Sequence, residues 1–491
     1  MRLEAGEGQP SPALKGGFMN KNALNLRILP ALSCLLLASC GGGGSGDKIV
    51  LTIGFWPESA QTQDVEMYTK WKERFEADNP QYTIKGMPYT YSTETVGTKA
   101  STGGLPDVWQ TWFTEPEKLM DKKIIRPITS QLKSLGWDEK MDEEMKDALT
   151  FNDEIYGLPR DGYGLGLLIN KRILGENGLL REKEDGTYSI YNADGIPPAY
   201  PMTWEEIYDW SNIIVNENED AAKGFLMYST NKNGGWVFSN IAWNFGAELE
   251  VKQGDRWVAN LDCDGAVKAL EWVKKMKSDG LTQEGIAVPY TDWFGNIGEK
   301  VAMAVVGSDV LQEAALQGSV DMKDLAFIPM PSGDGTHHYS LYGGTPFVFT
   351  KGVSDKKVEG ILKFFDYIGR SPSTSKTNLD AKKEGYEVAK KKNQPILPTI
   401  MPWKDASYLA EAKKLEDQYV NVEMEDYSPF FDSIQNNKKS EEPYAAQEMY
   451  ELLDTAIQSV FNNPDTVNCK ALLQTASAQL QKELDKGVNQ K

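Results

Sequence analysis

The sequence predicts an α/β protein with two large domains. Residues 48–56 are apolar and contain β-branched side chains, as in a buried strand, and a helical pattern and a second strand follow them. A strand, a helix and a strand in this order need a crossover connection, which implies a parallel sheet. The chain has 491 residues, which is more than one hydrophobic core usually supports, so we expect two large domains.

The N-terminal elements follow from apolar spacing and from stop signals. In residues 64–80, apolar and aromatic side chains recur at helical spacing, and an Asn-Pro pair ends the predicted helix. Residues 81–89 return as a strand, and residues 105–112 contain a further short strand. Residues 157–170 begin with Gly and Pro and then become apolar, which indicates a crossing between domains.

The second half of the chain alternates helices and strands in the same way. Thr203 and Glu206 form a capping box at the start of a helix predicted over residues 201–214. The other predictions are helices over 234–249, 264–280 and 356–368, strands over 298–309 and 343–350, a hairpin over 250–260, and two helices after residue 443 that are separated near 462–465.

Residues 19–40 have the features of an export signal. Lys21 and Arg27 precede about eleven apolar residues, whereas a helix that spans a bilayer needs roughly 20. The run ends in Leu-Ala-Ser-Cys at Cys40, and residues 41–46 are a Gly/Ser-rich tether. This ending resembles the lipobox of bacterial lipoproteins, which implies lipidation of Cys40 and removal of residues 1–39. The alternative is an ordinary signal that is cleaved elsewhere and a chance cysteine.

The cysteine count leaves one pairing open. Of the four cysteines, Cys34 lies in the signal and Cys40 lies at its end, so Cys263 and Cys469 remain. Outside the cell these two could form one disulfide, and the sequence does not decide whether they do.

Charge and residue inventory exclude several classes of function. The chain carries 52 Lys and Arg against 71 Asp and Glu, a net charge of −19, whereas nucleic-acid binding needs a basic surface. Its two histidines are the neighbours His337 and His338, and no zinc-protease, P-loop or nucleophile-elbow motif occurs. We therefore expect no nucleic-acid partner and no cofactor, and no motif marks a metal or catalytic residues, although inventory alone excludes neither a Ser-His triad nor a glycosidase with two carboxylates.

One segment matches a metal-binding pattern. Residues 260–271 fit the spacing of an EF-hand calcium loop. However, a hairpin and not a helix precedes them, and Lys268 stands where a ligand or its water would lie. Asp262 and Asp264 serve equally well as a cap of the next helix, so calcium binding stays open.

Aromatic and acidic side chains follow two predicted strands. Trp56 lies at the end of the first strand beside Glu58. Trp109 and Trp112 lie at the end of another strand near Glu115. Ligands of open α/β sheets bind at the carboxyl ends of strands, so both strands would deliver tryptophan and carboxylate to one crevice. An aromatic face suits a sugar ring, and carboxylates suit its hydroxyls. The alternative for each tryptophan is packing in the core.

The chain resembles the family 1 extracellular solute-binding proteins of ABC sugar importers, of the maltose-binding type. The resemblance covers most of residues 48–491 and rests on the order and spacing of LTIGFW, FEADNP, GGLPDVWQTW, YGLPRDGYGLGLLINKRIL, MTWEEI, GEKVAMAVVGSD, YGGTPFVF and NNPDTVNCKALLQTASAQL.

This resemblance implies a two-lobed periplasmic-binding-protein fold, with a ligand cleft between the lobes and a hinge of several segments. Carried over to this chain, lobe 1 comprises residues 48–159 and 345–395, and lobe 2 comprises residues 160–344 and 396–491.

The resemblance also implies the ligand-binding residues. After AMAVVG, the maltose-type pattern has a stacking tryptophan where this chain has Asp309, which favours a subsite directed at hydroxyl groups. Extra segments around 181–200 and 371–440 imply an oligosaccharide. The other family positions fall on Trp56, Glu58, Trp112, Glu115, Asp161, Tyr163, Trp236 and Tyr450.

The function implied by the resemblance is that of a binding protein without catalytic activity. It would capture a carbohydrate between its lobes and deliver it to ABC permease subunits, as a monomer held by a lipid anchor on the extracytoplasmic face of the cell membrane. The alternatives are a surface-anchored carbohydrate-active enzyme and a lobe that presents its ligand to a sensor kinase. The sugar, its linkage and its chain length stay open.

Overall fold

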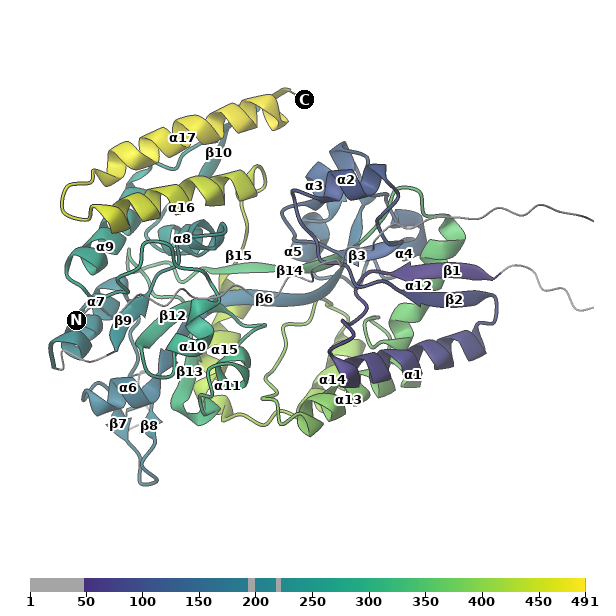
Figure 1. Ribbon diagram of the computed structural model, residues 1–491, viewed down its shortest axis with the longest axis horizontal. Helices are drawn as coiled ribbons and strands as arrows, with labels where there is room; N and C mark the ends of the chain where they lie inside the picture. The colour runs from purple at the N-terminus through teal and green to yellow at the C-terminus, as the bar shows by residue number, and fades with distance from the viewer. Residues whose placement is uncertain (1–47, 193–198, 218–221, 491) are drawn as a thin grey trace, which may run out of the picture. The chain divides into compact units, whose positions relative to one another are not determined.

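A computed structural model describes residues 48–192, 199–217 and 222–490 (Figure 1). The export signal with Cys40, the tether and part of the segment around 181–200 lie outside these ranges.

A nine-stranded mixed sheet organises the chain, which confirms the predicted α/β class. Its strands follow the order β2-β1-β3-β14-β6-β12-β9, while β13 pairs with β6 and β15 pairs with β14. These strands are β1 (Ile49–Ile53), β2 (Tyr82–Gly86), β3 (Val108–Gln110), β6 (Gly157–Asn170), β9 (Lys223–Leu226), β12 (Val301–Gly307), β13 (Leu325–Ile328), β14 (Ser340–Phe349) and β15 (Lys438–Ser440). Separate hairpins are formed by β4 (Thr150–Phe151) with β5 (Glu154–Ile155), β7 (Arg181–Glu182) with β8 (Tyr188–Ser189), and β10 (Glu250–Gln253) with β11 (Arg256–Ala259).

The first strand, helix and strand form the predicted parallel unit. β1 pairs with β2 in parallel along its whole length. The connecting helix α1 (Thr62–Asp78) buries Trp71 and Phe75. It ends at Asn79, whose backbone N–H donates to the carbonyl of Phe75 at 2.9 Å, so the predicted helix and its stop are confirmed.

Two long strands, β6 and β14, run from one part of the sheet to the other (Figure 1). At one end, residues 157–159 of β6 pair with the part of β14 that also pairs with β3. At the other end, residues 165–170 pair with β12 and β13. Between them Pro159 faces Pro346, and the register shifts between Gly344 and Pro346. Because proline has no N–H to donate, the pairing is weakest at this point of the crossing.

The other helices pack at the two ends of the sheet. α1, α12, α13 and α14 pack in series beside β1, whereas α8, α9, α16 and α17 pack on one another (Figure 1). The described part of the chain contains no helix with the length and apolar character needed to cross a membrane. The helices are α2 (Val96–Ser101), α3 (Pro116–Asp121), α4 (Thr129–Leu135), α5 (Glu143–Asp147), α6 (Lys171–Glu176), α7 (Trp204–Glu217), α8 (Asn233–Trp243), α9 (Asp264–Ser278), α10 (Asp292–Asn296), α11 (Glu313–Leu316), α12 (Asp355–Tyr367), α13 (Lys376–Lys391), α14 (Ala406–Glu416), α15 (Ser428–Asn437), α16 (Ala446–Asn462) and α17 (Cys469–Lys486).

The two parts of the sheet have different hydrophobic clusters. One cluster contains Leu51 and Phe75, and the other contains Leu167. Tyr408 of α14 belongs to the cluster of Leu51, although the division predicted from the sequence assigns residues 396–491 to lobe 2. The division into lobes remains a proposal, and this packing favours a lobe 1 that extends through α14.

Several local predictions in the second half are confirmed and one helix is shorter than predicted. The backbone N–H of Glu206 donates to Thr203 Oγ1 at 3.2 Å, and that of Thr203 donates to Glu206 Oε2 at 2.9 Å, so the capping box exists. The predicted hairpin and the two C-terminal helices are present. The helix predicted over 234–249 ends at Trp243, because the Asn244 side chain exchanges two hydrogen bonds with the backbone of Tyr339 next to β14.

The segment with EF-hand spacing forms the start of α9. The N-cap is Cys263, which makes no side-chain capping bond, so neither Asp262 nor Asp264 caps the helix. Asp264 lies in the first turn, where the helix dipole favours a negative charge. Within the described residues, no three His, Cys, Asp or Glu side chains gather as a metal site would require. Cys263 and Cys469 are both free thiols.

A buried ion pair joins the end of β6 to the chain that returns from α14. Lys171 Nζ lies 2.6 Å from Asp426 Oδ2, and only 2% and 1% of the two side chains are exposed. Burial raises the pKa of Asp426 to about 6, although the neighbouring ammonium group opposes the shift. Each charge therefore depends on the other for compensation.

We expect Lys171→Met to lower the free energy of unfolding by about 3–5 kcal/mol, because it leaves a buried carboxylate without its counter-charge. Chemical denaturation at pH 7 measures the change. Arg256→Met removes one partner of the exposed pair Arg256–Asp485 and serves as the control, with little expected effect. Equal stability of Lys171→Met and the parent protein would contradict the role of Lys171.

Candidate ligand-binding cleft

Three cavities follow β6 where it crosses between the parts of the sheet. We call them the aromatic cavity (Trp112, Trp236), the cationic cavity (Arg370, Lys382) and the outer cavity (Trp56), with volumes of about 290, 340 and 380 Å³. Asp309 lines both the aromatic and the cationic cavity, and Arg160 lines both the cationic and the outer cavity. Because neighbouring cavities share residues, they are parts of one cleft, of a size suited to a small molecule.

The aromatic cavity brings together side chains from distant parts of the chain. Trp112 follows β3 and is 44% exposed, which is unusual for so large an apolar side chain. Trp236 on α8 is half-buried, and its ring contacts those of Tyr163 and Tyr290 edge to face, with centroids 6.0 and 5.6 Å apart. Besides Asp309 and the tyrosines, the polar side chains of this cavity are Asn231, Lys232, Asn233, Thr345, Glu441 and Gln447.

Tyr450 lines the same cavity from α16 but is only 1% exposed. Its hydroxyl donates to Glu441 Oε1 at 2.8 Å. Burial is the main cause that raises the pKa of Glu441 to about 7, and the charge of Glu115 adds to the shift. Tyr450 is therefore placed to hold Glu441 and not to offer a stacking face.

Two aspartates lie where the aromatic and cationic cavities meet. Arg160 Nε donates to Asp161 Oδ2 at 2.6 Å, while Asp161 Oδ1 is buried and has no hydrogen-bond partner within the described chain. The Asp309 side chain is open to solvent inside the cleft, directly after β12. The surrounding protein and, to a smaller extent, Asp161 raise the pKa of Asp309 to about 6. Asp309 therefore has oxygen atoms open to the cleft that can accept hydrogen bonds from a ligand, whereas the unpaired oxygen of Asp161 is covered by its surroundings.

The two strand ends reach different parts of the cleft. Trp56 and Glu58 line the outer cavity, where the ring of Trp56 lies edge to face on Tyr68 at 5.3 Å between centroids. Trp112 lies in the aromatic cavity. The expectation that both strands deliver their side chains to a single crevice therefore holds for the cleft as a whole and not for one cavity.

Two residues near Trp112 are buried. Trp109 is 0% exposed and stacks on Tyr91 with centroids 5.6 Å apart, so for this tryptophan the core alternative is correct. Glu115 is 3% exposed, lines none of the three cavities and accepts a hydrogen bond from the Tyr91 hydroxyl. Burial raises the pKa of Glu115. Glu115 thus lies behind Trp112 and supports the wall of the cleft.

Sequence reasoning missed much of the cleft. Tyr290 and Glu441 face the aromatic cavity, and most of the cationic cavity comes from residues 368–408. No short motif marks this segment. The structure itself shows a local feature in the aromatic cavity: Asn231 and Lys232, just before and at the start of α8, have positive φ angles of 59° and 69°. Such strain is often found at binding sites.

The amino-acid sequence is similar to those of known bacterial binding proteins. A family model described as "Bacterial extracellular solute-binding protein" matches residues 70–382. The Escherichia coli (strain K12) protein YcjN, provisionally named an ABC transporter periplasmic-binding protein, is 21% identical over 411 residues, which cover 80% of this chain and 84% of YcjN.

Two solved structures have the same fold. The GacH receptor of Streptomyces glaucescens, determined without ligand and with acarbose, aligns with a TM-score of 0.66 at 15% identity over 89% of this chain and 99% of its own. The cyclic α-maltosyl-1,6-maltose binding protein of Arthrobacter globiformis aligns with a TM-score of 0.62 at 13% identity over 90% of this chain and 100% of its own. Both likenesses establish the two-lobed α/β fold.

We expect Asp309 to titrate near pH 6 in the free protein, because the surrounding protein disfavours its ionised form. Asp161→Asn should lower this pKa, since it removes a neighbouring negative charge and releases Arg160 from its ion pair. Carboxyl-carbon NMR across the pH range gives both values. A pKa of Asp309 near its ordinary 3.8 in the parent protein would contradict this description of the cleft.

Proposed function

The chain belongs to the family of bacterial extracellular solute-binding proteins, and from this premise we propose that it is the substrate-binding component of an ABC importer for a carbohydrate. The observation that carries the proposal is the exposed face of Trp112 in a cleft that also contains Trp236 and the solvent-open carboxyl group of Asp309. YcjN, named as an ABC transporter periplasmic-binding protein, supports the role in an importer, and the GacH receptor with its acarbose complex and the maltosyl-maltose binding protein of Arthrobacter support a carbohydrate ligand.

In this proposal the aromatic rings hold the sugar faces and the carboxylates accept hydroxyl hydrogens. Trp112 comes from the β3 side of the crossing strands, and Trp236 comes from the side of β12 and α8. A ligand that contacts both binds the closed arrangement of the lobes more tightly than the open one, and this difference drives closure. We propose direct contacts for Trp56, Glu58, Trp112, Asp161, Tyr163, Trp236 and Asp309, and supporting roles for Glu115 and Tyr450.

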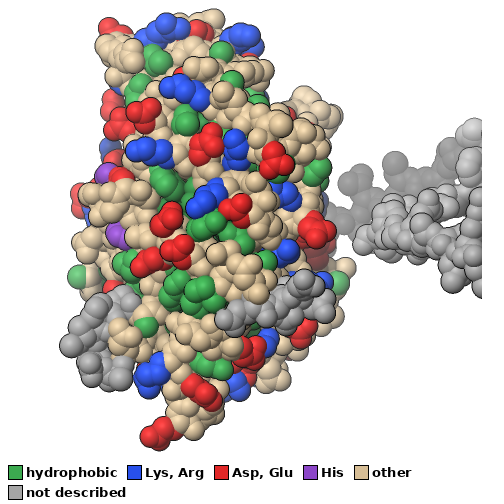
Figure 2. Space-filling model, turned by 90° about the vertical axis from the view of Figure 1, so that its left-hand side faces the viewer, with side chains coloured by type: hydrophobic (Ala, Val, Ile, Leu, Met, Phe, Trp, Pro, Cys, Tyr) green, Lys and Arg blue, Asp and Glu red, His purple; other side chains and the backbone are tan. Residues whose placement is uncertain are grey.

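The proposed ligand is an oligosaccharide, and the proposed partner is a membrane permease. Three cavities in succession along one cleft offer room for several sugar units. The family places the protein outside the cytoplasm. On the face in Figure 2, Lys and Arg are interspersed with Asp and Glu, without the continuous basic surface that nucleic acid would require. We further propose that the protein acts as a monomer.

One observation favours a second candidate, a carbohydrate-active enzyme. Asp309 and Glu441 line the same cavity and both have raised pKa values, as the acid of a glycosidase does. The family and its relatives are binding proteins, so we propose binding without turnover. Product analysis after prolonged incubation with each glycan that binds distinguishes the two. A sensor-presenting role would be indicated by the same binding without a partner permease.

Titration calorimetry with a glycan panel tests the proposed function, and we expect Trp112→Ala to weaken binding of the cognate glycan about tenfold to a hundredfold. The lost aromatic contact contributes about 1–3 kcal/mol, whereas the exposed side chain stabilises the fold little. Trp109→Ala, three residues away, is the matched control: it should cost about 3–5 kcal/mol of stability, since that ring is in the core. A panel in which no glycan binds would overturn the proposal.

We expect Cys40 to carry the lipid anchor that holds the protein at the outer face of the cell membrane. This expectation rests on the short apolar run that ends in Leu-Ala-Ser-Cys and is followed by a Gly/Ser-rich tether. Mass spectrometry of the N-terminal peptide of membrane-extracted protein should show a modified Cys40 and no residues before it. An unmodified Cys40, or a mature N-terminus elsewhere, would contradict the anchor.

A further inference from the structure

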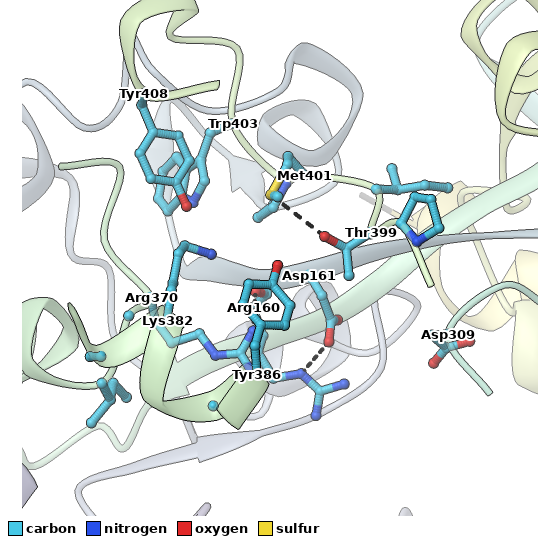
Figure 3. A pocket seen from close by; sticks show the side chains of 18 of the residues that line it. Arg160, Asp161, Asp309, Arg370, Lys382, Tyr386, Thr399, Met401, Trp403 and Tyr408 are labelled. Carbon is cyan, nitrogen blue, oxygen red and sulfur yellow. Dashed lines mark hydrogen bonds and ion pairs between the residues drawn. The ribbon is translucent and has the colours of Figure 1, made fainter. Parts of the chain in front are cut away.

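The cationic cavity contains three basic side chains from separate parts of the chain. Arg160 lies in β6, Arg370 follows α12, and Lys382 lies in α13. Figure 3 shows all three among the side chains that line this cavity of about 340 Å³. Arg370 and Lys382 are twelve positions apart, and β6 brings Arg160 to them from more than two hundred positions away. This concentration of positive charge contrasts with the acidic balance of the whole chain.

Two of these cations lack an ion-pair partner. Arg160 is paired with Asp161. Within the described residues, neither Arg370 nor Lys382 has a carboxylate within ion-pair distance: Arg370 Nη1 donates only to the carbonyl of Arg160, at 3.3 Å, and Lys382 Nζ lies 5.7 Å from the ring centre of Tyr408. Burial and the nearby Arg370 lower the pKa of Lys382 to about 8.

The acidic groups near the cavity are already engaged or lie at its edge. Glu416 is 4% exposed and accepts hydrogen bonds from the Thr399 hydroxyl at 2.6 Å and from the Tyr386 hydroxyl at 3.3 Å. Burial raises its pKa, so its charge is disfavoured. Asp309 lines the side toward the aromatic cavity. Two half-buried cations that repel one another are costly unless an anion joins them.

Aromatic side chains form the rest of the wall. Tyr68, Tyr386, Trp403 and Tyr408 line the cationic cavity, and the last three are labelled in Figure 3. A ligand that fills the cavity therefore meets flat apolar surfaces together with concentrated positive charge. A sugar ring that bears an acidic substituent combines both properties, whereas a neutral sugar would leave the two cations uncompensated.

We propose that the cleft takes an acidic saccharide, and that Arg370 and Lys382 hold its carboxylate or sulfate group in the cationic cavity. This inference rests on the proposed function and names the substrate class. The planar guanidinium of Arg370 can donate two parallel hydrogen bonds to such an oxyanion, and the ammonium group of Lys382 adds a point charge. Arg160, already paired, keeps Asp161 from repelling the anion.

Titration calorimetry with defined probes tests the charge requirement. The probes are tetragalacturonate, the same tetramer with its carboxyl groups reduced to alcohols, a hyaluronan tetrasaccharide, a chondroitin sulfate tetrasaccharide, maltotetraose and xylotetraose. We expect at least one acidic probe to bind about tenfold or more tightly than the neutral ones, with an affinity that falls as salt increases. Comparison of the hyaluronan and chondroitin sulfate probes separates carboxylate from sulfate as the preferred group.

Variants of the same exported chain test the residues. Lys382→Met keeps most of the side-chain volume and should weaken the acidic probe about tenfold to a hundredfold, with a smaller salt dependence. Lys383→Met is the matched control on the same helix, because Lys383 is 51% exposed and pairs with Glu387 at 3.8 Å. It changes the net charge equally and should leave binding unchanged. Arg370→Gln is a second variant that tests the same cavity if Lys382→Met melts at a lower temperature.

The outcomes separate this inference from the function on which it rests. Equal affinity for tetragalacturonate and its reduced form, binding of neutral probes only, or equal binding by the Lys382 and Lys383 variants would overturn the acidic-ligand inference while leaving carbohydrate binding intact. Absence of binding by every probe would overturn the proposed function, and the inference with it. Selective binding of an acidic probe that both cavity variants weaken would support it.

Discussion

The antiparallel pairing of β6 with β14 is the contact on which both parts of the molecule depend. These strands belong at one end to the sheet of β1, β2 and β3, and at the other to the sheet of β12, β13 and β9. They therefore connect the two hydrophobic clusters. Pro159 opposite Pro346 and the register shift beside them remove donors from the ladder at one point, so the link can bend there without loss of the pairing at either end.

The cleft is built around this crossing. Arg160, Asp161 and Tyr163 follow Pro159 directly, so the residues that bridge the cavities lie where the strand pair is weakest. The glycines of this segment serve packing: a Cβ atom on Gly162 would lie 2.7 Å from Met145 Cε of α5, and one on Gly164 would lie 2.1 Å from Ile434 Cδ1 of α15. The glycine pattern of this segment thus reflects the close approach of a helix to the strand, and a bend at the crossing changes the cleft itself.

The sequence predicted those features that neighbouring residues determine, and it did not predict those that depend on tertiary packing. The parallel unit, the capping box at Thr203 and the C-terminal helices follow from periodicity and caps, which neighbouring residues determine. Trp109 and Trp112 could not be told apart in this way. β3 ends at Gln110, so Trp109 remains within the sheet, paired with Val348 of β14, whereas Trp112 lies beyond the strand. Tyr450 falls on a family position, but only the packing of α16 on α8 shows that its ring is buried.

The cationic cavity could not be predicted from the sequence for a related reason. Its electrostatics depend on the charges nearest to it and not on the net charge of the chain. Arg370 and Lys382 lie twelve positions apart on either side of a loop, Arg160 lies more than two hundred positions before them, and no spacing rule connects the three. The net charge of −19 describes the whole surface, but at physiological ionic strength charges act over about 8 Å. Groups inside a cavity respond to their immediate neighbours: the charge of Arg370 helps to lower the pKa of Lys382, and Glu416 is held by hydrogen bonds from Thr399 and Tyr386. An acidic surface and an anion-attracting cleft are therefore compatible in one chain, and the ligand's charge is governed by the second.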